Sequence, residues 1–507
     1  MILFSSMPPL FFAATLLSYF APVKTQAAPD TRPNFVFIIG DDISAEDFGC
    51  YGNPGIHTPN IDRLAAQGLR FTNAYLTASS CSPSRSSIFT SRYPHNLETA
   101  AELHGLLPEG IPMFPKLLRH SGYYTAHAGK AHFGGESDVL SGPAVAAFDI
   151  GGDGERDDLK GGRGGENQWI ARLRGRPQQK PFFMWFAAHD AHRSWDADSF
   201  AGMHRPSDVR VPPYLVDTIE TRTDLAHYYD EITRLDYFVG EVVRELTRQK
   251  VLENTVIIVM ADNGRPFPHS KTQLYDDGIK TPLIIRWPAG IAEGASTASL
   301  VSSIDIAPTL LELAGVERPA SFQGVSLVPI LHEPKAIVRD YIFAEHNWHN
   351  FSAHVRMVRH GNFVYVHNAW PQLPQPGAAD TFYNPSADAL KALHTQNKLT
   401  PLQAIVLQPH APAEELYNLA ADPSQVRNLA LEASPPEALA SLRAILKHWT
   451  EETGDTIPLK PTPTNVIYET GMKTAEFWRG DAPGAASQAA KINRPGPVRE
   501  SLPVQKK

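Results

Sequence analysis

The sequence predicts an α/β fold in which a large, mixed but mostly parallel central sheet is covered by helices on both faces. Continuous apolar runs at 34–39, 181–188 and 255–261 are typical of strands that are buried on both sides. Between the last two runs, apolar residues from Leu225 to Leu246 recur at the spacing of one helix face. Because strands that alternate with helices form layered sheets, these patterns favour a sheet between two helical layers.

The chain after about residue 335 has a different pattern. Its strands are shorter and a late helix follows them, so we expect a smaller α+β domain with an antiparallel sheet. The predicted organisation is a signal peptide at 1–28, a large N-terminal domain at 29–335, the smaller domain at 336–460, and a tail at 461–507 that is disordered or wraps the surface. The other elements expected are helices at 59–67, 113–121, 306–314 and 437–449 and strands at 341–344 and 362–367.

Composition excludes several classes of function. The 507 residues are 42% hydrophobic and 20% charged, which is ordinary for a globular protein. The formal net charge of −8 argues against non-specific nucleic-acid binding, which needs a basic surface. An anionic substrate would therefore have to be held by a local cluster of cations.

The N-terminus predicts export. Leu10 to Phe20 is an apolar run too short to span a bilayer, and it ends near the small residues Ala27 and Ala28. We interpret it as a cleaved signal, with a lipid anchor or an uncleaved segment as the alternative. The mature chain is then periplasmic or secreted and has no membrane span.

Two acidic clusters follow predicted central strands. Asp41 and Asp42 come directly after the first strand, and Asp262 and Asn263 follow the strand at 255–261. Adjacent buried carboxylates repel each other, and a hard divalent cation with oxygen ligands resolves this repulsion. Turn-forming Asp residues are the alternative interpretation.

Cys81-Ser-Pro-Ser-Arg85 is the sharpest motif in the chain. A buried inert Cys and a disulfide between Cys50 and Cys81 are two simple interpretations. A third is a thiol nucleophile whose pKa is lowered by Arg85. A thiol is, however, a poor partner for a hard metal with oxygen ligands, so the motif indicates a different chemistry.

The motif Cys81–Arg85 resembles the signature of type I sulfatases of the alkaline phosphatase superfamily, in which the Cys is oxidised to formylglycine. Asp41-Asp42 and Asp262-Asn263 resemble the calcium ligands of this family, and 122–132 resembles its Lys-x-His motif. The resemblance extends from residue 33 to about 455. Two positions depart from it: Ala131 stands where many sulfatases have Trp, and Thr90-Ser91 replaces the usual Thr-Gly.

The resemblance implies a fold, cofactors and activation. The fold would be alkaline-phosphatase-like, with the catalytic domain at 29–335. One Ca²⁺ per chain would be held by Asp41, Asp42, Asp262, Asn263 and residue 81. Cys81 would become formylglycine through a formylglycine-generating enzyme or an anaerobic sulfatase-maturating enzyme.

The resemblance also implies residue roles. A hydroxyl of the formylglycine hydrate would attack sulfur, with Arg85 and calcium favouring its alkoxide and Asp262 taking the proton. Fixed cations must meet the charge on the sulfonyl oxygens, and Lys130 and Lys271 are the candidates. His189 would protonate the leaving group, and His132 would assist the collapse that regenerates the aldehyde. Arg265 is the competing cation near the strand end.

Within the family, two stretches resemble the heparan N-sulfatases (sulfamidases) more than the arylsulfatases. They are 181–193 and 262–275, and 366–368 and 449–455 add to the likeness. The expected substrate is a sulfated saccharide, with the N-sulfate of glucosamine as the leading hypothesis. The candidates for sugar contacts are His104, His192, Arg193, His346 and His349.

Three other functions stay open at this point. An O-sulfatase acting on an algal or animal polysaccharide is the first. A phosphatase or phosphonate monoester hydrolase of the same superfamily is the second; such enzymes usually bind zinc or manganese through extra His ligands. The third is a glycan-binding protein that keeps the fold without activity, for which replacement of Cys81 would change nothing.

Overall fold

The computed structural model describes residues 31–134, 140–151 and 166–500, with gaps at 197, 292, 375, 409, 469 and 475–476. The chain divides between Thr31 and Arg32, and the strands and helices described below belong to the unit that starts at Arg32. The predicted signal peptide, 1–28, lies outside the described residues. Within these residues, no helix has the length and apolarity that a membrane span requires.

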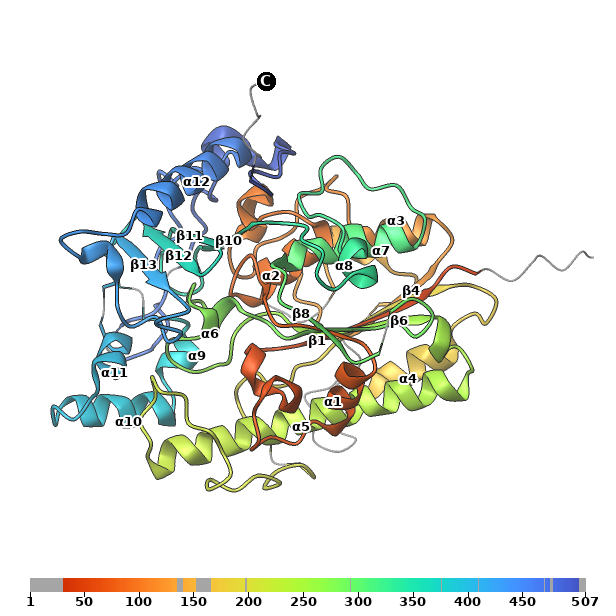
Figure 1. Cartoon of the computed structure of the whole chain (residues 1–507), viewed down its shortest axis with the longest axis horizontal. Coiled ribbons are helices and arrows are strands. Elements are labelled where there is room, and N and C mark those ends of the chain that lie inside the picture. The colour runs from red at the N-terminus through yellow and green to blue at the C-terminus, as the bar shows by residue number, and fades with distance from the viewer. Residues whose placement is uncertain are drawn as a thin grey trace, which may run out of the picture. The chain divides into compact units, whose positions relative to one another are not determined.

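A seven-stranded sheet forms the centre of this unit, in the order β4-β5-β1-β6-β7-β2-β8 (Figure 1). Its four strands β4, β5, β1 and β6 pair in parallel, and β7 is antiparallel to both of its neighbours. The predicted mixed, mostly parallel sheet is therefore confirmed. The bounds are β1 Asn34–Gly40, β2 Leu69–Phe71, β4 Tyr124–Gly129, β5 Phe182–Ala187, β6 Thr255–Ala261, β7 Leu283–Arg286 and β8 Ala295–Thr297.

Helices cover both faces of this sheet, as Figure 1 shows. Alternation along β1 explains why both faces are apolar: Phe35, Phe37 and Ile39 point into one core, and Val36 and Ile38 into the other. The first core contains residues of α2 Cys81–Thr90, α3 Phe114–His120, α7 Ile306–Leu313 and α8 Val328–His332; the second contains residues of α1 Pro59–Ala66, α4 Glu166–Gly175 and α5 Ile219–Arg248.

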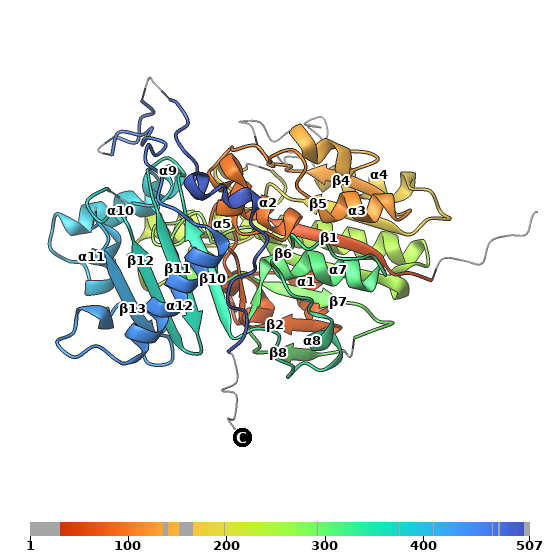
Figure 2. The same cartoon turned by 90° about the horizontal axis from the view of Figure 1, so that it is seen from above.

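A separate antiparallel sheet confirms the predicted smaller α+β part of the fold (Figure 2). One of its faces packs on α12, where the rings of Phe343 and Trp449 stack with their centroids 4.9 Å apart. Its bounds are β10 Tyr341–His346, β11 Val355–His360, β12 Phe363–Asn368 and β13 Glu414–Asn418, with α12 Ala438–Thr453. The remaining elements are α6 Asp276–Ile279, α9 Ala379–Phe382, α10 Pro385–His394, α11 Pro401–Val406 and the short pair β3 Ala74–Tyr75 and β9 Val301–Ser302.

The described residues after Pro461 lie on the rest of the unit. Trp348 Nε1 donates a hydrogen bond to the Pro463 carbonyl at 2.7 Å, and Thr462 Oγ1 donates to Glu102 at 2.6 Å. Further along, the guanidinium of Arg92, at the end of α2, donates to the carbonyls of Ala490 and Ile492. The end of α2 and the C-terminal segment are therefore held together by hydrogen bonds.

Candidate active site

The register of the parallel strands brings the predicted site residues to one edge of the sheet. Gly40 of β1 pairs with Ala261 of β6, and Ala187 of β5 pairs with Gly129 of β4. The residues that follow these four strand ends include Asp41, Asp262, His189 and Lys130. Side chains far apart in sequence meet because ligands collect at the carboxyl ends of parallel strands.

The two acidic clusters form one buried group. Asp42 Oδ1 accepts a hydrogen bond from Asn263 Nδ2 at 2.5 Å, and the Asp42 backbone N–H donates to Asp262 Oδ1 at 3.3 Å. Burial and the charge of Asp41 raise the pKa of Asp262 to about 7; burial likewise raises the pKa of Asp42 to about 7, although Lys271 opposes it. Asn263 Oδ1 is buried and has no hydrogen-bond partner among the described residues.

These oxygens fit a hard divalent cation. The buried carboxylates of this group repel one another and Asn263 Oδ1 has no donor among the described residues, and a bound ion such as Ca²⁺ would offset both costs. Three side chains, Asp41, Cys81 and Asp262, also place their ligand atoms within 4.8 Å of one another. The residues that would hold the ion are thus Asp41, Asp42, Asp262 and Asn263, next to position 81.

Cys81 is the first residue of α2 and is buried. Its Sγ lies 3.7 Å from Asp41 Oδ1 and 3.9 Å from Asp42 Oδ1. Burial raises the pKa of the Cys81 thiol well above its usual value, although Lys130 and Lys271 oppose it, which disfavours a thiolate nucleophile. Cys50 and Cys81 are both free thiols, so the disulfide interpretation is wrong for this structure.

Two cations contact the acidic group: Arg85 of α2 and Lys130, which follows β4. Arg85 Nε donates to Asp262 Oδ2 at 2.7 Å and Arg85 Nη1 to the Lys130 carbonyl at 2.9 Å. Lys130 Nζ pairs with Asp41. Burial alone would raise the pKa of Asp41, but Lys130, His192 and Arg85 hold it well below its usual range, so this carboxylate stays ionised.

Lys271 supplies a third cation to the buried group. Its Nζ lies 2.8 Å from Asp42 Oδ2 and 2.8 Å from Asp380 Oδ2. Arg265 instead pairs with Asp47 at 3.1 Å, so Lys271 is the cation at the centre. Burial alone would lower the pKa of Lys271, but Asp380 and Asp42 raise it well above its usual value. The ammonium is therefore charged and lies between two anions.

The position of Lys271 also indicates how many metal ions the site would hold. Asp42, His192 and Asp380 form a second group of side chains whose ligand atoms lie within 4.8 Å of one another. His192 Nε2 is 3.6 Å from Asp380 Oδ2 and 3.9 Å from Asp42 Oδ2. Since the Lys271 ammonium already lies between the two carboxylates, this group is neutralised without a second ion.

The histidines predicted for the site differ in their partners. His132 Nε2 and His104 Nδ1 are 2.9 Å apart, and His349 Nδ1 is 2.6 Å from Ser80 Oγ. Burial, Lys130 and His104 hold the pKa of His132 well below its usual value, so its imidazole is neutral. His189 is buried, and its backbone N–H donates to Glu166 Oε1 at 2.8 Å. His346, at the end of β10, is also buried, and burial and Arg356 lower its pKa to about 4.

Backbone conformations at the site are strained in the way that functional loops often are. Asp42, His104 and His132 have φ values of 59°, 60° and 52°, in the left-handed region that non-Gly residues rarely occupy. Gly129, with φ 94°, ends β4, and a Cβ there would lie 1.7 Å from the Ala187 carbonyl oxygen. Only Gly therefore allows β4 to approach β5 and to direct Lys130 toward Asp41.

The structure also explains one departure from the family signature. Ser91, which stands where the signature usually has Gly, caps α2 with φ 54°. Its Oγ donates to the Ile304 carbonyl at 2.7 Å and accepts from the Gly324 N–H at 3.1 Å. These two hydrogen bonds offset the cost of a left-handed non-Gly residue, which is about 1 kcal/mol.

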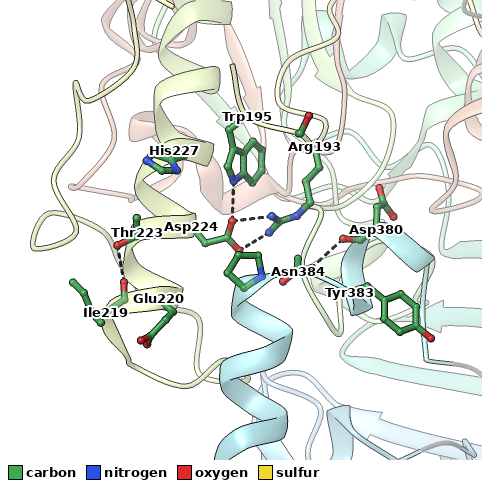
Figure 3. Close-up of a pocket in the computed structure, with 12 residues that line it drawn as sticks. Arg193, Trp195, Ile219, Glu220, Thr223, Asp224, His227, Asp380, Tyr383 and Asn384 are labelled. Atoms are coloured by element: carbon green, nitrogen blue, oxygen red, sulfur yellow. Dashed lines mark hydrogen bonds and ion pairs between the residues drawn. The ribbon is translucent and has the colours of Figure 1, made fainter. Parts of the chain in front are cut away.

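Arg193 lines a cavity of about 750 Å³ and is held there by hydrogen bonds. Figure 3 shows Asp224 of α5 between the Arg193 guanidinium and the Trp195 indole. Two guanidinium nitrogens of Arg193 donate to Asp224 at 2.7 Å each, and its Nε donates to the Pro266 carbonyl. Arg193 is therefore a fixed part of the cavity wall. Asp380, the partner of Lys271, also lines this cavity.

Comparison with known proteins gives the class to which this fold and site belong. A family model described as Sulfatase matches residues 33–316, and one described as N-sulphoglucosamine sulphohydrolase, C-terminal, matches residues 268–367. Human N-sulphoglucosamine sulphohydrolase is 30% identical over 482 residues, which cover 86% of this chain and 93% of the relative. The relatives are sulfuric ester hydrolases. The chain belongs to the sulfatase family.

Other similar proteins are sulfatases whose names give other activities. An ulvan-active sulfatase of Formosa agariphila is 28% identical over 84% of this chain and 76% of its own, and human arylsulfatase A is 28% identical over 82% and 87%. Two solved structures share the fold, each at 21% identity. One is a complex with its substrate D-glucosamine-2-N,6-O-disulfate (TM-score 0.62; 83% of this chain, 98% of that one), and the other is a 2-O GAG sulfatase (TM-score 0.60; 83% and 92%).

Sequence reasoning missed one residue at the centre and one wall of the site. Asp380 lies on the four-residue helix α9, outside any motif, and only the fold reveals its contact with Lys271. The segment 461–507 was predicted to be disordered or to wrap the surface, and the prediction did not anticipate that Asn465, Lys473 and Phe477 line a cavity together with His104. No pattern in the sequence signals either feature, because both depend on contacts between distant segments.

Proposed function

We propose that this protein is an exported, calcium-dependent sulfatase that removes sulfate from a saccharide, with the N-sulfate of glucosamine as its substrate. The observation that carries the proposal is the position of residue 81, whose Sγ lies 3.7 Å and 3.9 Å from two carboxylates of an oxygen-only cluster. Three buried cations, Arg85, Lys130 and Lys271, pair with the carboxylates of this cluster, Asp262, Asp41 and Asp42 respectively.

The chain's own residues have distinct tasks in the proposed reaction. Formylglycine at position 81 would supply an oxygen nucleophile, and Ca²⁺ would supply fixed positive charge for oxygen ligands. Lys130 and Lys271 are placed to stabilise negative charge on the sulfuryl oxygens. Arg85 orients Asp262, which accepts the proton of the nucleophile. His189 donates a proton to the leaving group, and the neutral His132 accepts one when sulfate departs.

The substrate proposal rests on the relatives and is open to a direct test. We expect release of sulfate from N-sulfoglucosamine to exceed release from glucosamine 6-O-sulfate and from a 2-O-sulfated uronate disaccharide by about 100-fold in kcat/KM, since a misplaced polar group leaves buried partners unpaired. Ion chromatography of sulfate measures all three rates. Activity on an O-sulfate with none on the N-sulfate would replace this proposal with an O-sulfatase, for which the ulvan-active relative is a precedent.

Removal of divalent ions tests the cofactor. Calcium added to the chelator-treated protein at about 100 times its dissociation constant is expected to raise Tm by about 2–5 °C, because an ion that binds only the folded state stabilises it. Asn263→Ala, which deletes the orphaned oxygen, should reduce this shift. The exposed Asp388→Asn is the matched control and should keep it. A shift with Mg²⁺ as large as that with Ca²⁺ would contradict the assignment of calcium.

The phosphatase alternative is disfavoured by one contact. A second ion would need the space between Asp42 and Asp380, where the Lys271 ammonium makes two contacts of 2.8 Å. Metal analysis that finds one ion per chain agrees with the proposal, and two zinc ions per chain would contradict it.

A further inference from the structure

A second cavity, of about 310 Å³, opens beside the candidate active site. The residues that line it include His104, Trp348, Lys473, Phe477 and Arg479. Its volume lies in the range of small-molecule sites in proteins. No Asp or Glu is among the described residues that line it.

His104 joins this cavity to the reacting centre. Its backbone N–H donates to Ser82 Oγ at 2.8 Å, and Ser82 is the neighbour of Cys81. Its imidazole Nδ1 lies 2.9 Å from His132 Nε2. His104 therefore makes this cavity a close neighbour of residue 81.

The outer wall comes from a short hairpin in the C-terminal segment. Val466 and Lys473 form an antiparallel bridge, and the Thr474 N–H donates to the Asn465 carbonyl at 2.8 Å. The hairpin is attached to the loop after β10, because the Asn465 N–H donates to the Asn350 carbonyl at 2.9 Å. The position of Lys473 is thus set by backbone hydrogen bonds.

Two cationic side chains of the cavity, Arg479 and Lys473, differ in whether they have an ion-pair partner among the described residues. Arg479 pairs with Glu102 at 2.9 Å and donates to the Leu103 carbonyl at 3.0 Å, so its charge is compensated. Lys473 is exposed and makes no ion pair with any residue that the structure describes. Trp348 and Phe477, with ring centroids 5.2 Å apart, provide an apolar surface next to it.

We propose that Lys473 binds a second anionic group, a sulfate or a carboxylate, on the saccharide whose first sulfate lies at residue 81. The inference rests on the proposed function and adds a specificity-determining residue to it. A cation in a concave site whose described lining contains no Asp or Glu attracts anions, and an ammonium forms strong charge-assisted hydrogen bonds with either group. Trp348 and Phe477 offer apolar area to the face of the sugar ring that carries this group.

The test compares substrates with one and two anionic groups. They are N-sulfoglucosamine, glucosamine-2-N,6-O-disulfate, and N-sulfoglucosamine linked to a uronate. In Lys473→Gln the ratio of kcat/KM for a two-anion substrate to kcat/KM for N-sulfoglucosamine should fall about tenfold, mainly through KM, since one charged hydrogen bond is lost. Lys473→Glu should lower the ratio further. A loss with the disulfate alone identifies a second sulfate, and a loss with the uronate alone identifies a carboxylate.

The matched control is Lys491→Gln, another exposed lysine of the same segment that does not line the cavity. Its ratios should equal those of the wild type. Unchanged ratios in Lys473→Gln, in a wild-type background that hydrolyses all three compounds, would overturn the inference and leave the proposed function intact. Wild-type protein that hydrolyses none of the three would overturn both.

Discussion

Cys81→Ala is expected to lower kcat for sulfate release by about 10⁴-fold or more, because it removes the group from which the nucleophile is made. The fold should persist, since the change deletes one sulfur atom from a buried position at the start of α2. Sulfate release and a thermal unfolding curve measure the two effects. Cys50→Ala is the matched control: Cys50 is half-buried, lies outside the site and should be replaceable with full activity.

Mass spectrometry of the peptide Ser79–Arg92 completes this experiment. Active protein from a host with a maturating enzyme should have an aldehyde in place of the Cys81 side chain. Active protein with an unmodified Cys81 would refute the formylglycine mechanism, and full activity in Cys81→Ala would favour another catalytic mechanism. Absence of sulfate release from the modified wild type, with unchanged glycan binding in Cys81→Ala, would favour the non-catalytic interpretation.

The second large effect is expected from Arg85→Met. Arg85 is fully buried and is the nearest cation to Asp262, at 2.7 Å, with Asp41 at 4.0 Å. Its loss leaves these carboxylates without a partner on that side. We expect kcat/KM to fall about 10³-fold, as for other groups that stabilise charge in the transition state. The free energy of unfolding should fall by about 3–5 kcal/mol, the cost of breaking a buried ion pair.

Arg92→Met separates these two effects. Arg92 is also buried, at the end of the same helix, but its guanidinium bonds the C-terminal segment. It should lower stability and leave kcat/KM per folded molecule at the wild-type value. Equal losses of kcat/KM in the two variants would mean that Arg85 acts only through stability. Arg85→Lys should not rescue activity, because a lysine cannot contact both Asp262 and the Lys130 carbonyl.

Elements with strong local signals were predicted well. The strand at 255–261 has the predicted bounds, and α5 extends beyond the predicted stretch at both ends. Strands of three or four residues, β2, β7 and β8, were missed because so short a segment gives no period to recognise. The segment of β4 was recognised as part of the stretch 122–132 that resembles the Lys-x-His motif, and it was not predicted as a strand.

The sequence by itself determined the family and indicated the residues that we propose for the reaction. Cys81 and Arg85 lie one helical turn apart, and the acidic pairs directly follow buried strands, so short-range order was enough to identify them. Lys271, His104 and His132 were already candidates, but only the tertiary structure decided which groups they contact: Lys271 lies between Asp42 and Asp380, and His104 lies against His132. The position of Lys473 in a cavity with His104 was also decided by the tertiary structure. The physical reason is that such contacts depend on sheet register and on the packing of loops, which bring together residues from 28 to 229 positions apart without leaving a local pattern.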